Sequence, residues 1–163
     1  MARKPPLMMP VLSLSAEYLV MGHLMRRNIL TFKAPPYNEG YDLICMHPDP
    51  RRAKELVRVQ VKSRYQTDSD RAFPVKERTF SAFDYLVVVF LNVGSFYGGE
   101  PGSAERQEPE FYTFPKTFVM KNLKRVASGF DRVHTSRLNI HRYKNERGFE
   151  LIAEDLRIPY PSR

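Results

Sequence analysis

The chain has almost no cysteine: Cys45 is the only one among 163 residues. A single cysteine excludes an intrachain disulfide and a zinc site built from cysteines, and it suits a reducing cytoplasm. The four histidines are scattered, and His134 and His141 lack the i, i+4 spacing of a helical metal pair. The serines have no elbow motif and no nearby base in the sequence, so nucleophilic catalysis has no support.

Long apolar runs are also missing. The longest, residues 85–91, is far below the ~20 residues that a membrane helix needs, and its branched residues favour a buried strand. At the N-terminus, Pro10 breaks an apolar stretch that is too short for the core of a signal peptide. The sequence therefore predicts a cytoplasmic protein that does not enter a membrane.

What the chain does have is basic charge. The formal net charge is +8 and the pI is near 9.7, which makes the surface attractive to polyanions, most commonly nucleic acid. Charge alone is equally compatible with a merely soluble basic protein. The length and the 42% hydrophobic content predict one domain over residues 1–163, with an N-terminal tail at 1–12 and a long loop at 94–109.

The apolar patterns predict an α/β domain with helices flanking a mixed central β-sheet. Residues 13–28 are expected to form a helix, with Leu14, Tyr18, Met21 and Met25 at helical spacing and Val20 and Leu24 alongside them. A brief helix is expected at 79–83 and another at 116–126. The expected strands cover residues 28–33, 41–46, 56–64, 85–91 and 110–114.

An acid, an amide and a lysine stand where two of these strands would pair. An antiparallel hairpin of 41–46 and 56–64, centred on Arg51, sets Asp42 opposite Gln60, with Lys62 two residues on and on the same face. Such a group at a sheet edge can hold a hard divalent ion and activate a water. The alternative is an ordinary cross-strand ion pair between Asp42 and Lys62 on a solvated face.

The order of these residues resembles the PD-(D/E)XK nuclease superfamily. The resemblance rests on Glu17 in the first helix, the run from Gly40 to Leu43 that opens a strand, and Gln60-Val61-Lys62 on the next strand. That superfamily includes type II restriction enzymes, archaeal Holliday-junction resolvases and intron homing endonucleases. Gln60 stands where the family usually has an acid, and the intron homing endonucleases are similar in tolerating glutamine there. The resemblance implies a restriction-endonuclease-like core and a nuclease-like domain.

The resemblance also implies roles for the site residues. Asp42 would be the principal ligand of Mg²⁺, for which Mn²⁺ can substitute, with Gln60 as the second ligand and the Val61 carbonyl as a neutral oxygen. Glu17 would hold a water or a second ion. Lys62 would orient the attacking water or stabilise charge on the phosphorane. Without its carboxylate at position 60, the metal cage is expected to bind weakly until DNA is present. For Glu17 the alternative is an acid that complements the helix dipole.

DNA is the expected partner, contacted through basic side chains that neutralise phosphates. The candidates are Arg51 and Arg52 at the hairpin tip, Arg64, and the later cluster of Lys121, Lys124, Arg137, Arg142 and Lys144. A solvated basic face is the alternative for both groups. Since many relatives cut both strands by dimerising, a homodimer or higher homo-oligomer is a further possibility.

Three functional interpretations follow from the sequence. The first is a magnesium-dependent DNA endonuclease that hydrolyses phosphodiester bonds with a metal-activated water. The second is a nucleic-acid-binding or interaction domain that keeps the fold and has lost cleavage, which the absent acid at Gln60 makes credible. The third is a basic structural protein without a nucleic-acid role.

Overall fold

The structure, a computed structural model, describes residues 10–52, 54–66, 71–94, 107–125, 131–135 and 139–161. The helices are α1 (Pro10–Arg26), α2 (Lys116–Lys121) and α3 (Glu146–Asp155), with short 3₁₀ turns η1 (Glu77–Thr79) and η2 (His141–Tyr143). The strands are β1 (Leu30–Lys33), β2 (Leu43–Met46), β3 (Leu56–Gln66), β4 (Ala72–Pro74), β5 (Tyr85–Gly94), β6 (Glu110–Pro115), β7 (Leu123–Lys124) and β8 (Arg132–His134).

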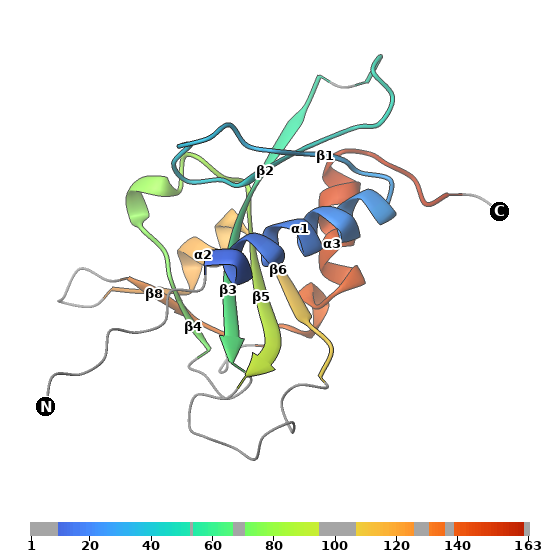
Figure 1. The fold of residues 1–163 in the computed structure, drawn as a ribbon. Helices are drawn as coiled ribbons and strands as arrows, with labels where there is room; N and C mark the ends of the chain where they lie inside the picture. The colour runs from blue at the N-terminus through green and yellow to red at the C-terminus, as the bar shows by residue number, and fades with distance from the viewer. Residues whose placement is uncertain are drawn as a thin grey trace, which may run out of the picture.

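A five-stranded mixed sheet forms the centre of the molecule, in the order β1-β2-β3-β5-β6 (Figure 1). Only β3 and β5 pair in parallel, and the other neighbours are antiparallel. The predicted α/β class with a mixed central sheet is confirmed. The expected strand at 85–91 is a fully buried inner strand of this sheet, between β3 and β6, because branched residues on both of its faces pack against other layers.

The two faces of the central sheet are covered differently. Helices α1 and α3 pack on one face, where Val20, Leu24 and Ile152 meet Val59 and Val87. A second sheet, in the order β4-β8-β7, covers the opposite face together with α2 and η2. Strands β4 and β8 were not expected, because their three-residue segments are too short to show a periodicity.

Helix α1 turns to the core only part of the apolar set that its spacing marked out. Ala16, Val20 and Leu24 are buried, whereas Leu14 is 43% exposed and Tyr18 is 55% exposed. The helix is apolar on two sides, so periodicity alone could not choose between them. It also begins at Pro10, inside the expected tail at 1–12, since proline is favoured in the first turn.

The C-terminal helix α3 was not expected, although the sequence carries its signal. Phe149, Ile152, Ala153 and Leu156 recur at helical spacing, and all four are buried. The helix expected at 116–126 is shorter, because α2 ends at Lys121 and the chain enters β7. Of the loop expected at 94–109, residues 95–106 lie outside the described residues.

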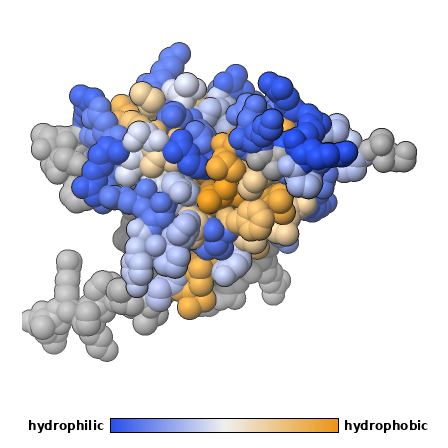
Figure 2. Space-filling view, turned by 90° about the horizontal axis from the view of Figure 1, so that it is seen from above, coloured by the Kyte–Doolittle hydropathy of each residue, from blue (hydrophilic) through white to orange (hydrophobic). Residues whose placement is uncertain are grey.

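The surface seen from above is mostly hydrophilic, with apolar side chains gathered near the middle of the view and in smaller groups elsewhere (Figure 2). Cys45 is buried, and burial raises the pKa of its thiol to about 12, which leaves the thiol unreactive at neutral pH. Within the part of the chain that the structure describes, no helix is long and apolar enough to cross a membrane.

A buried ion pair ties α3 to the end of α1. The guanidinium of Arg27, whose side chain is 4% exposed, donates to both carboxylate oxygens of Glu150, at 2.7 and 2.8 Å. It also donates to the carbonyls of Ile158 and Pro159, which holds the C-terminal segment in place. The hydrogen bond from Arg27 lowers the pKa of the Glu150 carboxyl below its ordinary value of 4.5.

Glu150→Gln is expected to lower the free energy of unfolding at pH 7 by about 2–3 kcal/mol, because it leaves the buried guanidinium without its carboxylate. A carboxyl with a depressed pKa contributes stability above its unfolded pKa, and this contribution is lost as pH falls through the folded value. The natural protein should therefore lose this increment below about pH 4.3, and the variant should not. Urea unfolding of the natural protein and the variant between pH 3 and 7 measures the loss of stability at pH 7 and its pH dependence. Glu154→Gln, an exposed acid of the same helix, is the control and should match the natural protein.

Candidate active site

The register of β2 and β3 brings the predicted site residues together. Leu43 pairs with Val59 and Ile44 with Arg58, so Asp42 comes to the position opposite Gln60. The predicted hairpin register is confirmed. Strand β2 begins at Leu43 rather than at Tyr41, so Asp42 lies just before the strand, at its open end.

Asp42 is fixed by two hydrogen bonds to β3. Its backbone N–H donates to the Val59 carbonyl at 2.8 Å, and its Oδ2 accepts the Val61 N–H at 2.7 Å. The carboxylate thus replaces a backbone acceptor of the ladder. Because the N–H and C=O of one strand residue point the same way, the Val61 carbonyl faces the same side as the Asp42 carboxylate.

The turn before Asp42 depends on Gly40. Gly40 has a φ of +101°, and a Cβ there would lie 2.5 Å from the Ala82 Cβ. Any other residue would be strained and would collide with the turn after η1. The glycine therefore allows the Asp42 turn to pack directly against that segment.

The side-chain amide of Gln60 has a buried oxygen, Oε1, without a hydrogen bond among the described residues. Gln60 and Lys62 pair with Leu86 and Val88 of β5, so both side chains project from the face that the small sheet covers. Leaving a buried amide oxygen unpaired costs about 1–3 kcal/mol, so the position favours a cation or donor that binds there.

Lys62 lines a cleft of about 510 Å³ between β3 and the β4–η1 segment. Burial lowers the pKa of its ammonium below the ordinary 10.5, and the nearby charge of Lys76 lowers it further. The charge of Asp42 acts in the opposite direction and raises it. The half-buried ammonium of Lys62 thus lines open space on the same face of β3 as the Gln60 side chain.

Glu17 is not brought into this group. It lies on α1, which packs on the other face of the sheet, and its carboxylate forms an ion pair with Lys33 of β1. Lys33 pairs with Leu43, so the ion pair lies close to the beginning of β2. No local pattern predicts this contact, because the partner of a lysine on a short edge strand is set by tertiary packing.

The oxygen atoms at this edge suit a hard divalent cation. The Asp42 carboxylate, the unpaired Gln60 Oε1 and the Val61 carbonyl are the ligand types that Mg²⁺ prefers. Over the described ranges, no three His, Cys, Asp or Glu side chains gather as a metal cluster. The fit to an ion thus rests on one carboxylate with neutral oxygens.

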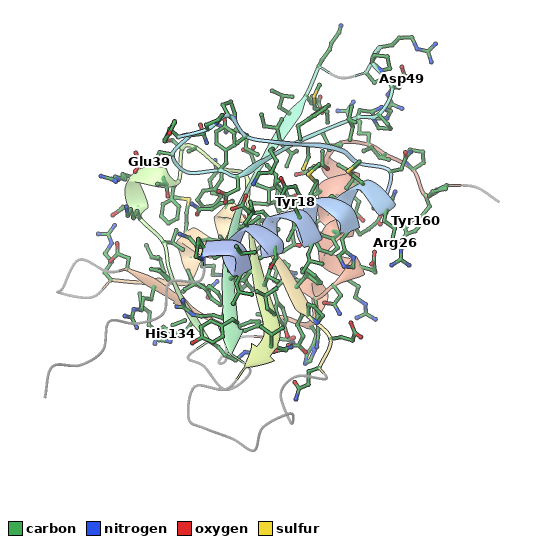
Figure 3. All side chains as sticks on the ribbon, viewed as in Figure 1. Tyr18, Arg26, Glu39, Asp49, His134 and Tyr160 are labelled. Carbon is green, nitrogen blue, oxygen red and sulfur yellow. The ribbon has the colours of Figure 1, made fainter. Side chains whose placement is uncertain are left out.

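The expected DNA contacts do not form one surface. Arg51 and Arg52 lie at the tip of the β2–β3 connection, the opposite end of the ladder from Asp42, and Arg51 is bound to Asp49 at 2.8 Å. Figure 3 shows Asp49 at one end of the molecule and His134, on the small sheet, at the other. The two arginines therefore lie at the far end of the hairpin from Asp42.

The other basic candidates lie on the face of the small sheet. Arg64 donates to the Ala72 carbonyl at 2.9 Å, and Lys144 donates to Glu110 at 2.6 Å. Arg142 stacks on the Tyr143 ring, 4.5 Å from its centroid, and with Lys121 lines a second cleft of about 400 Å³. Lys124 is exposed on β7, and Arg137 lies outside the described residues.

Comparison with known proteins gives distant structural likenesses. No family model matches the chain, and no curated protein matches it. A bacterial homing endonuclease, I-Ssp6803I, is 16% identical over 91% of this chain and 93% of its own, with a TM-score of 0.48. Hjc from Archaeoglobus fulgidus, a Holliday junction resolvase, is 12% identical over 83% of this chain and 98% of its own, with a TM-score of 0.45. At these scores neither likeness carries an argument about activity.

Proposed function

We propose that the protein is a DNA endonuclease that hydrolyses phosphodiester bonds with the help of a divalent cation, Mg²⁺ or Mn²⁺. The observation that carries this proposal is the buried, unpaired Oε1 of Gln60 in the register position opposite the anchored Asp42 carboxylate. The net charge of +8 supports a polyanionic substrate.

In this proposal Asp42, Gln60 and the Val61 carbonyl would hold the ion. A divalent ion supplies Lewis acidity toward a phosphate oxygen and makes a water more nucleophilic. The Val61 N–H holds the Asp42 carboxylate at the sheet edge, so its geometry is set before substrate binds. Lys62 lies in the adjoining cleft, where its ammonium can hold a phosphate oxygen and stabilise charge that develops there.

Glu17 could take part in this reaction only without its ion pair to Lys33. To hold a water or a second ion, its carboxylate would have to leave Lys33 and reach the edge of the sheet from the α1 face. With that ion pair intact, one cation is the expected stoichiometry.

A second function has one observation in its favour. Gln60 contributes no charge, so this site should bind a cation more weakly than a site with a second carboxylate would. A domain that binds DNA and does not cut it would have the same fold and the same basic charge.

Supercoiled plasmid separates the two functions. The endonuclease should convert it to nicked or linear forms in Mg²⁺ or Mn²⁺ and leave it intact in EDTA. Binding to a labelled duplex in Ca²⁺ is measured in parallel with the same preparation. DNA binding that weakens with salt but is never followed by nicking in either ion would establish the binding domain instead.

Gln60→Glu is expected to bind Mg²⁺ at least as tightly as the natural chain, because it adds a second carboxylate, and Gln60→Ala should bind it more weakly and cut more slowly. In EDTA the new buried carboxylate lies near Asp42, so Gln60→Glu should unfold at a lower temperature. Saturating Mg²⁺ should restore the unfolding temperature of Gln60→Glu, since a ligand at one hundred times its Kd adds about 2.7 kcal/mol to the free energy of unfolding.

Thermal unfolding with and without Mg²⁺ measures this difference, and plasmid nicking gives the rate. Gln107→Glu, which adds the same charge at an exposed position, is the control and should show no added response to Mg²⁺. If neither substitution at Gln60 alters the Mg²⁺ response or the nicking rate, Gln60 does not face the ion.

A further inference from the structure

The cleft that contains Lys62 has a second wall. Its lining consists of Lys62 from β3, residues 74–78 from the end of β4 through η1, and Asp131 before β8. The cleft volume of about 510 Å³ is within the range of small-molecule sites, so it can hold a short stretch of one nucleic-acid strand rather than a duplex.

Lys76 is an exposed cation of this second wall. Lys62 and Lys76 line the same cleft from its two sides, which places two ammonium groups over one space. Two like charges at close range repel each other, and a bound polyanion relieves that repulsion.

The second wall is braced so that Lys76 keeps its position. Arg78 donates to Glu39 at 2.6 Å, and Arg125 donates to Glu77 at 2.7 Å. The first contact joins η1 to the turn that carries Asp42, and the second joins it to the end of β7. Both acids are exposed, so each pair contributes little stability, but together they hold η1 between two parts of the fold.

The two ion pairs also neutralise two of the charged residues that line the cleft. Glu77 is occupied by Arg125 and Arg78 by Glu39, so their charges are largely compensated. Asp131 contributes its backbone carbonyl, which accepts the Val75 N–H at 3.0 Å, and its carboxylate is the remaining acid of the lining. The positive charges of Lys62 and Lys76 therefore exceed the single negative charge of Asp131 in this lining.

We propose that Lys76 binds a phosphate of the substrate strand next to the phosphate held at Lys62, so that the β4–η1 segment is the second wall of the DNA-binding cleft. The assignment rests on the proposed function for the role of Lys62, but the binding of nucleic acid to this wall does not require cleavage. Lys76 has no motif around it in the sequence, and only the fold brings it to Lys62.

The test is the salt dependence of binding to a single-stranded and a double-stranded oligonucleotide in EDTA. Each phosphate contact contributes about −0.9 to the slope of log affinity against log salt for duplex DNA and about −0.7 for a single strand. Lys76→Met should remove the contribution of about one phosphate contact, so the duplex slope should flatten by about 0.9. Duplex binding should weaken roughly eightfold at 0.1 M salt. Lys76→Arg should restore both quantities.

The control is Lys116→Met, which removes the same charge at the start of α2 and should leave the slope unchanged. In plasmid nicking, Lys76→Met should raise KM and leave kcat within about twofold of the natural value, because the contact holds substrate before and during the reaction. The Mg²⁺ response of thermal unfolding should not change.

An unchanged slope in Lys76→Met, with affinity equal to that of the control, would overturn the assignment. A fall in kcat without any change in slope would also overturn it, since Lys76 would then act on Lys62 rather than on DNA. If the natural protein never nicks plasmid, the proposed endonuclease fails while the slope in EDTA still decides the role of Lys76.

Discussion

Asp42→Asn should lower the rate of Mg²⁺-dependent plasmid nicking by on the order of 10²–10³-fold, the loss that commonly follows removal of one oriented electrostatic group. The amide oxygen of asparagine can still accept the Val61 N–H, so the turn and the register of β2 should survive. What the variant loses is the negative charge that holds the cation. Nicking rates at saturating and limiting Mg²⁺, with circular dichroism to monitor the fold, measure the effect.

The matched control for Asp42 is Glu108→Gln, which removes one negative charge from an exposed position before β6. It should cut at the natural rate. Asp42→Asn protein that folds normally and nicks plasmid at the rate of this control would remove Asp42 from the mechanism.

Lys62→Met should lower the nicking rate by a similar factor, on the order of 10²–10³, and at the same time raise the unfolding temperature at pH 7. Burial disfavours the charged form of Lys62, so its folded pKa lies below its unfolded value. The cost to stability is complete below the folded pKa, and it disappears as pH rises to the unfolded value near 10.4. Methionine occupies a similar volume without that cost.

The gain in stability of Lys62→Met should therefore shrink as pH rises through the folded pKa of Lys62. Thermal unfolding at several values between pH 7 and 10 measures this trend. Lys116→Met is the control, and it should neither slow nicking nor gain stability with the same pH dependence. A Lys62→Met protein that cuts normally would show that the ammonium takes no part in the reaction.

The local part of the site could be predicted from the sequence because it depends on one hairpin. The turn fixes which residues face each other, so Asp42 and Gln60 follow from the positions of two strands and their midpoint at Arg51. Lys62 follows from the alternation of side chains along β3. The mixed sheet and the α/β class follow from the same strand patterns.

The rest of the site depends on packing that no local pattern records. The small sheet is built from segments of two and three residues, so neither its strands nor the place of Lys76 in the same cleft as Lys62 could be expected. Helix α1 is apolar on two sides, so its spacing did not separate the buried Val20 and Leu24 from the exposed Leu14. The ion pair of Glu17 with Lys33 arises between elements whose packing only the folded chain decides.

The most direct test of the site is anomalous diffraction from crystals of the protein soaked in Mn²⁺. The proposed endonuclease predicts one strong peak at the open end of β2, within coordination distance of oxygen atoms of Asp42, Gln60 and Val61. The amide of Gln60 should turn its Oε1 toward the peak. A fully soaked crystal with no peak there, or with the ion bound elsewhere and the Gln60 amide turned away from Asp42, would contradict it.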